Sequence, residues 1–108
     1  MPKAEFIKDE MEFEFLLGSE SVFVVDCTAT WCGPCRLVAP LIDRLSEDYG
    51  DRAKVSKLDI DANKSIGVSF GLKSIPAVMF FKDGELQETL VGVKPYETFS
   101  ETLEKYLS

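Results

Sequence analysis

The chain has 108 residues, of which 45% are hydrophobic and 29% charged, as expected for one globular domain spanning residues 1–108. Its net charge of −7 argues against binding to nucleic acids or to an anionic membrane surface, because both need a basic face. The charge favours solubility and could select partner proteins with basic docking surfaces. No stretch approaches the roughly 18 apolar residues of a membrane span.

The first half of the chain predicts a helix, a strand and a second helix. The N-terminus lacks the apolar run of a signal peptide, so we expect a cytoplasmic protein. Asp9 and Glu12 resemble a capping box, and the apolar stripe that follows stops at Gly18. The β-branched run Val22–Val25 predicts a strand buried on both faces. After a turn-like segment, helical spacing up to Gly50 joins Val38, Leu41, Ile42, Leu45 and Tyr49.

The second half predicts two further apolar strands, a hairpin and a final helix. Residues 55–60 form a strand pattern, whereas residues 64–72 fit a strand or a helix equally well by periodicity. Ala77–Phe81 is a second unbroken apolar run, and Asp83-Gly84 predicts a hairpin to a strand around Leu86–Val91. One helical stripe then contains Tyr96, Phe99, Leu103, Tyr106 and Leu107. Alternating strands and helices with one hairpin indicate an α/β fold with a mixed sheet.

The cysteines predict a reactive site and not a structural disulfide scaffold. The chain has three, and two of them form a C-x-x-C at Cys32 and Cys35. Such a pair can bind zinc or exchange disulfides. Zinc needs four ligands, and the chain has no His and no second C-x-x-C. We therefore predict a redox site and no metal.

The position of Cys32 and Cys35 between a buried strand and a helix assigns their chemical roles. A thiol at a helix N-terminus faces unpaired N–H groups, which favour the thiolate that attacks disulfide sulfurs. We expect Cys32 to be exposed and to attack, forming a mixed disulfide. Cys35, one turn into the helix and less accessible, would then resolve it. Pro34 suits an early helical position.

Val24-Val25-Asp26 followed by Trp31-Cys32-Gly33-Pro34-Cys35 resembles the thioredoxin family. Further matches in order and spacing are Lys57, Asp59, Ile75-Pro76, Gly84 and Gly92. The resemblance implies a thioredoxin fold, with a central mixed five-stranded sheet flanked by four helices, and makes residues 64–72 a short helix. It implies general protein-disulfide reduction, with no cofactor beyond the redox-active disulfide. We expect a monomer, because nothing in the sequence demands a larger assembly. Partners would be disulfide-containing target proteins and a thioredoxin reductase linked to NADPH or ferredoxin.

The resemblance also implies a substrate-binding groove beside the cysteines. Pro76 is expected to follow a cis peptide bond, which would leave the backbone of Ile75 free to pair with an extended substrate segment. The active-site loop would contain Trp31, Gly33 and Pro34. The groove would be formed by Trp31, Ile75, Pro76, Val91, Gly92 and Val93, with Gly92 allowing close backbone approach.

Asp26 and Lys57 are the other candidate catalytic residues. A carboxylate at the end of a buried run is costly to bury unless it is paired or has a task, and burial should raise its pKa. The alternative is a solvated strand end. The resemblance implies that Asp26 assists proton transfer at Cys35 and that Lys57, on the neighbouring strand, is its electrostatic partner; a surface lysine is the alternative.

Two positions depart from the family pattern. Members commonly have an aromatic residue at the position of Cys27 and a tryptophan at that of Thr28, a tryptophan that Asp61 usually contacts. We expect Cys27 to point to the sheet face opposite Asp26, as a small buried hydrophobe. The alternative is a third redox thiol.

Two other functions remain to be weighed. A binding module of the same fold would not need Cys32, Cys35, Asp26 and Pro76 together. An oxidant or isomerase is disfavoured because oxidising relatives usually carry a His between the cysteines, where it stabilises the thiolate. The sequence therefore predicts a thiol–disulfide oxidoreductase that works as a reductant.

Overall fold

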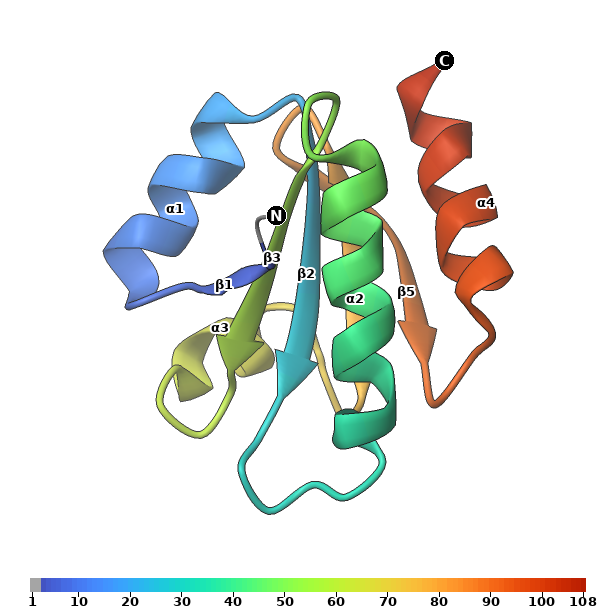
Figure 1. Ribbon diagram of the computed structural model, residues 1–108. Helices are drawn as coiled ribbons and strands as arrows, with labels where there is room; N and C mark the ends of the chain where they lie inside the picture. The colour runs from blue at the N-terminus through green and yellow to red at the C-terminus, as the bar shows by residue number, and fades with distance from the viewer. Residues whose placement is uncertain (1–2) are drawn as a thin grey trace.

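A computed structural model describes residues 3–108, and its helices and strands alternate along the chain except for two consecutive strands before the last helix (Figure 1). The strands are β1 (Glu5–Phe6), β2 (Val22–Thr28), β3 (Lys54–Asp59), β4 (Ala77–Lys82) and β5 (Glu85–Val91). The helices are α1 (Glu10–Ser19), α2 (Cys35–Tyr49), α3 (Lys64–Ser69) and α4 (Tyr96–Leu107). None of these helices is long and apolar enough to cross a membrane.

The strands form one mixed sheet in the order β1-β3-β2-β4-β5. β1 and β2 both run parallel to β3, whereas β4 runs antiparallel to β2 and to β5. This confirms the predicted five-stranded mixed sheet with four helices. β2 lies at the centre, and six of its seven residues are buried, which explains its unbroken apolar run.

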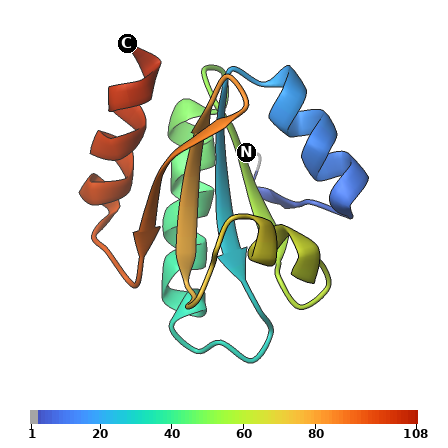
Figure 2. The same cartoon turned by 180° about the vertical axis from the view of Figure 1, so that it is seen from behind.

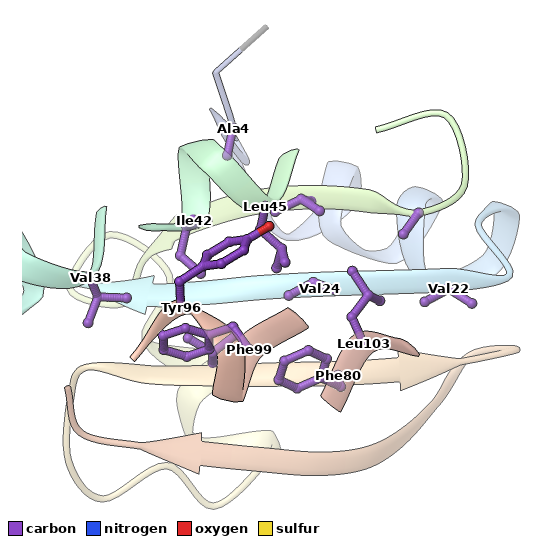
Figure 3. Packing of buried hydrophobic residues seen from close by; sticks show 13 residues of the cluster. Ala4, Val22, Val24, Val38, Ile42, Leu45, Phe80, Tyr96, Phe99 and Leu103 are labelled. Carbon is purple, nitrogen blue, oxygen red and sulfur yellow. The ribbon is translucent and has the colours of Figure 1, made fainter. Parts of the chain in front are cut away.

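Helices cover both faces of the sheet and create two apolar cores (Figures 1 and 2). On one face, α2 and α4 pack against alternate residues of β2 and β4, including Val24 and Phe80 (Figure 3). On the other face, α1 and α3 cover the next residues along the same strands. The side chains there include a cluster of aromatic rings with centroids 5.2–5.9 Å apart, formed by Phe13, Phe23, Phe70 and Phe81.

Local signals in the sequence explain where several elements begin and end. The Asp9 carboxylate accepts a hydrogen bond from the Glu12 N–H at 2.9 Å, and α1 begins at the next residue. The Glu12 side chain bonds back to the N–H of Lys8 at 2.7 Å. Asp83 and Gly84 have φ values of 51° and 83°, as a type I′ hairpin turn requires. The ambiguous residues 64–72 contain the short helix α3, as the family resemblance implied.

Three connections meet at one end of the sheet (Figures 1 and 2). They are residues 29–34 between β2 and α2, residues 70–76 between α3 and β4, and residues 92–95 between β5 and α4. These connections contain most of the residues that the sequence predicted for the site.

Candidate functional site

Cys32 and Cys35 form a disulfide in the connection that leads from β2 into α2. Their Cα atoms are 5.4 Å apart, a normal separation for a disulfide. The N–H of Cys35 donates to the Cys32 sulfur at 3.3 Å. Arg36 and Leu37 donate to the carbonyl groups of Gly33 and Pro34, so the chain already winds helically at Gly33. After reduction, the donor from Cys35 would stabilise a thiolate on Cys32.

The surroundings of the cysteines differ from the expectation in two ways. Cys32 was expected to be exposed, yet in the disulfide form it is 4% exposed, close to the 2% of Cys35. The cause is tertiary packing, since Cys32 and Cys35 form a buried cluster with Ala29 against which Ile75 packs. In addition, α2 begins at Cys35, so Cys35 is the first helical residue and does not lie one turn inside the helix. Both sulfurs are therefore largely covered in the disulfide form.

Trp31 and the 92–95 connection supply exposed apolar surface near the disulfide. Trp31 is 67% exposed, and Val91 and Val93 are about half exposed. The indole N–H of Trp31 donates to the Asp61 carboxylate at 2.6 Å. Asp61, whose usual tryptophan is replaced by Thr28, therefore binds a different indole, which fixes the orientation of Trp31.

The predicted groove residues of the 70–76 and 92–95 connections are joined by backbone contacts. The Ile75–Pro76 peptide bond is cis, as expected. The N–H of Gly92 donates to the Pro76 carbonyl at 2.8 Å, and Gly92 has a φ of 97°, which favours glycine. Ile75 reaches the cysteines, whereas Trp31 is bonded to the connection after β3.

Asp26 is buried without a hydrogen-bond partner. It is 1% exposed, and neither of its carboxylate oxygens has a partner among residues 3–108. Burial raises the pKa of Asp26 to about 7, because the charged form is poorly solvated. The positive charge of Lys57 acts in the opposite direction and the negative charge of Asp43 adds to the rise. A carboxyl group that titrates near neutral pH can both take up and release a proton under physiological conditions.

Lys57 lies beside Asp26 but forms its salt bridge elsewhere. The two residues are paired across β2 and β3, so their side chains share one sheet face. The Lys57 ammonium group lies 3.0 Å from the Asp43 carboxylate. Lys57 is therefore an electrostatic neighbour of Asp26, and its direct ionic partner is Asp43 of α2. The sequence reasoning did not identify Asp43.

Comparison with known proteins identifies the family of this chain. The family model for thioredoxin matches residues 4–105. The chain belongs to the thioredoxin family. It is 41% identical over 107 residues to thioredoxin 1 of Synechococcus elongatus, covering 99% of this chain and 100% of that protein.

Other thioredoxins match over different shares of their length. A chloroplastic M-type thioredoxin of Pisum sativum is 40% identical over 105 residues, which are 97% of this chain and 61% of that protein. The chain thus spans less than two thirds of this plant relative. The solved structure of a mutant thioredoxin from Halobacterium salinarum matches with a TM-score of 0.90 at 27% identity, covering 98% of this chain and 92% of that one.

The chemistry available to this member of the thioredoxin family is centred on sulfur. Within residues 3–108, no three His, Cys, Asp or Glu side chains gather in a way that could hold a metal ion. The cysteine pair, with the N–H of Cys35 directed at the Cys32 sulfur, can perform thiol–disulfide exchange, and the buried carboxyl group of Asp26 can take up or release a proton near neutral pH.

Cys27 is fully buried on the face opposite Asp26, where it packs with the aromatic cluster. Burial, and the nearby charge of Asp26, raise the pKa of its thiol above the usual range, which makes a thiolate unfavourable. We expect Cys27→Ala to leave disulfide-reduction turnover within a few-fold of the parent rate. A large loss, measured with insulin as the substrate, would mean that Cys27 is a functional thiol.

Proposed function

We propose that this chain is a general protein-disulfide reductase that donates two electrons from the Cys32–Cys35 dithiol. The observation that carries the proposal is the Cys32–Cys35 disulfide at the start of α2, with an N–H donor directed at the Cys32 sulfur. Membership of the thioredoxin family supports the same activity. The chain would act as a monomeric single domain over residues 1–108, in the cytoplasm, with no cofactor beyond this disulfide.

In the first step, the Cys32 thiolate attacks one sulfur of a substrate disulfide. A bond forms between Cys32 and that sulfur, the substrate disulfide breaks, and the second substrate sulfur leaves as a thiolate. The substrate segment would lie along Trp31, Ile75, Pro76, Val91, Gly92 and Val93. The exposed apolar side chains of this groove and the packing of Ile75 against the cysteines support that assignment.

In the second step, Cys35 gives up its proton and attacks the Cys32 sulfur. The mixed disulfide breaks, the Cys32–Cys35 disulfide forms, and the remaining substrate sulfur leaves as a thiolate that takes up a proton. Asp26 would accept the Cys35 proton, and Lys57 would modulate the charge of Asp26. The position of Asp26 on the sheet face covered by α2, and its pKa of about 7, support this role. Gly33 and Pro34 form the two-residue turn that brings the two sulfurs together.

Insulin reduction tests the proposal and identifies the electron donor. Dithiothreitol with the chain should accelerate the precipitation of insulin chains relative to dithiothreitol alone. The reductant is then replaced by thioredoxin reductase with NADPH, or by a ferredoxin-linked reductase with reduced ferredoxin. Activity with only one system identifies the partner. If the protein reduces insulin with dithiothreitol but with neither reductase system, both reductase assignments are contradicted and the disulfide chemistry stands. If the protein accelerates insulin reduction with none of the three reductants, the proposed function is overturned.

A further inference from the structure

The ion pair behind the disulfide suggests a function for Asp43, and this inference rests on the proposed function. Asp26 and Lys57 have opposite formal charges and are paired on adjacent strands, an arrangement that would normally produce an ion pair. Neither carboxylate oxygen of Asp26 has a partner within residues 3–108. The Lys57 ammonium group lies 3.0 Å from Asp43 Oδ1 instead. Something therefore keeps Lys57 from pairing with the buried carboxyl group.

The position of the Asp43 carboxylate is fixed from two sides. Oδ1 accepts a hydrogen bond from the N–H of Ala4 at 3.1 Å as well as the contact with Lys57. The side chains of Lys57 and Asp43 are only 11% and 23% exposed, so solvent screens their attraction much less than that of a surface pair. The Lys57 ammonium group also lies 5.9 Å from the ring centroid of Phe6 in β1. These contacts hold Lys57 on the β1 side of the sheet.

Few other ionisable groups approach Asp26 on this face. Lys57 comes from β3, and α2 contributes Asp43. The central strand β4 places the apolar Val78 opposite Asp26. Helix α4 also covers this face, and its buried residues are uncharged: Thr102 and, as Figure 3 shows, Tyr96, Phe99 and Leu103. The hydroxyl of Tyr96 donates to Asp48, further along α2. Within residues 3–108, Lys57 and Asp43 are therefore the formal charges that change the pKa of Asp26.

We propose that Asp43 is a positioning residue for disulfide reduction: it binds Lys57 and so leaves the carboxyl group of Asp26 without an ionic partner, free to exchange a proton with Cys35. A carboxylate bound to an ammonium group holds a proton poorly at neutral pH. With Lys57 bound to Asp43, Asp26 is about half protonated near pH 7, so its ionised form can accept a proton from Cys35 and its protonated form can release one. Asp43 therefore acts through Lys57 and does not touch the reacting sulfurs.

The direct test is a titration of the Asp26 side-chain carboxyl carbon by NMR in the oxidised protein, without any substrate. Asp43→Asn should lower the midpoint by about one pH unit, because Lys57 becomes free to pair with Asp26 and a nearby negative charge is lost. Asparagine preserves the size of the side chain and an oxygen that can accept from Ala4. Amide chemical shifts of the variant would verify that the fold is kept.

Two further variants separate positioning from a general charge effect. Glu47→Gln removes the same charge from an exposed position of the same helix, and should move the midpoint by less than about 0.3 pH unit because solvent screens it. In a Lys57→Met background, Asp43→Asn should lower the midpoint by less than half as much as in the parent, since no ammonium group remains that could pair with Asp26. Equal shifts from Asp43→Asn with and without Lys57, or no more shift than from Glu47→Gln, would overturn the proposal.

The pH profile of insulin reduction connects this electrostatic effect to the reaction. The acid limb of the profile should move in Asp43→Asn by the same amount and in the same direction as the Asp26 midpoint, while that of Glu47→Gln stays in place. A shifted titration with an unshifted profile would overturn the role of Asp43 in the reaction. An inactive parent protein would overturn the proposed function itself, which the substrate-free titration distinguishes from a failure of the Asp43–Lys57 argument.

Discussion

Replacing Cys32 by serine should reduce insulin turnover at least about a hundredfold, down to the rate of the reductant alone. A serine hydroxyl stays protonated at neutral pH, so the N–H of Cys35 has no anion to stabilise and no mixed disulfide can form. The increase in turbidity as insulin chains precipitate, followed over a range of protein concentrations, measures the loss of turnover. A Cys32→Ser variant with parental turnover would show that the reaction does not use this sulfur.

Replacing Cys35 by serine should give a different failure that identifies its role. The first attack would still occur, but no thiol would remain to break the mixed disulfide. The variant should therefore accumulate as a covalent adduct with substrate, visible as a mass increase that dithiothreitol removes. Cys27→Ala is the matched control, because it removes a sulfur that is fully buried on the opposite face. Adduct formation by the Cys32→Ser,Cys35→Ser double variant would contradict the assignment.

Replacing Asp26 by asparagine should stabilise the protein strongly at alkaline pH and little at acidic pH. The pKa of Asp26 is about 7 in the folded protein and 3.8 as its ordinary value. At pH values between these two pKa values, the Asp26 carboxyl group has released its proton in the unfolded chain but still holds it in the folded protein. Fewer bound protons in the unfolded state mean that the free energy of unfolding falls as pH rises through this window. Above about pH 7 the free energy of unfolding has fallen by its full amount, up to roughly 4 kcal/mol, because the folded protein then buries an ionised carboxylate.

The asparagine variant removes the ionisable group while nearly preserving its shape, so it should lose this pH dependence. Urea unfolding of the oxidised proteins at pH 4 and pH 8 would measure it. The gain over the parent at pH 8 should exceed the gain at pH 4 by up to about 4 kcal/mol. Glu47→Gln, on the exposed side of α2, should change stability by less than about 0.5 kcal/mol at either pH. A gain in Asp26→Asn that is equal at both pH values would show that Asp26 titrates normally in the folded state.

Much of the fold could be predicted because the central strands have an unambiguous pattern. Val22–Val25 and Ala77–Phe81 are continuous apolar runs, and both proved to be strands in the middle of the sheet. Asp83-Gly84 specified its hairpin through backbone conformation alone. Residues 64–72 could not be assigned in this way, since six helical residues are too few for periodicity to distinguish a helix from a strand.

The site was predictable where it depends on neighbours in the sequence, and less so where it depends on tertiary packing. Cys32 and Cys35 were identified by their spacing, by the absence of other zinc ligands and by their place between a strand and a helix. The burial of Cys32 depends on Ile75, about forty residues later in the chain, and no local pattern could reveal it. Likewise, Asp43 was missed because its partnership with Lys57 follows from how α2 is rotated above β3. That rotation is set by the whole apolar stripe of the helix.

The outer edge of β5 affects how this molecule behaves at high concentration. β5 is the last strand of the sheet, and it pairs with β4 on one side only. An open edge of this length can recruit a strand from another copy and start aggregation. Here the strand carries Glu85 and Glu88, and its pairing with β4 is interrupted by an irregularity at Phe80 and Phe81. Both features disfavour a further strand, so the sheet should resist edge-to-edge growth.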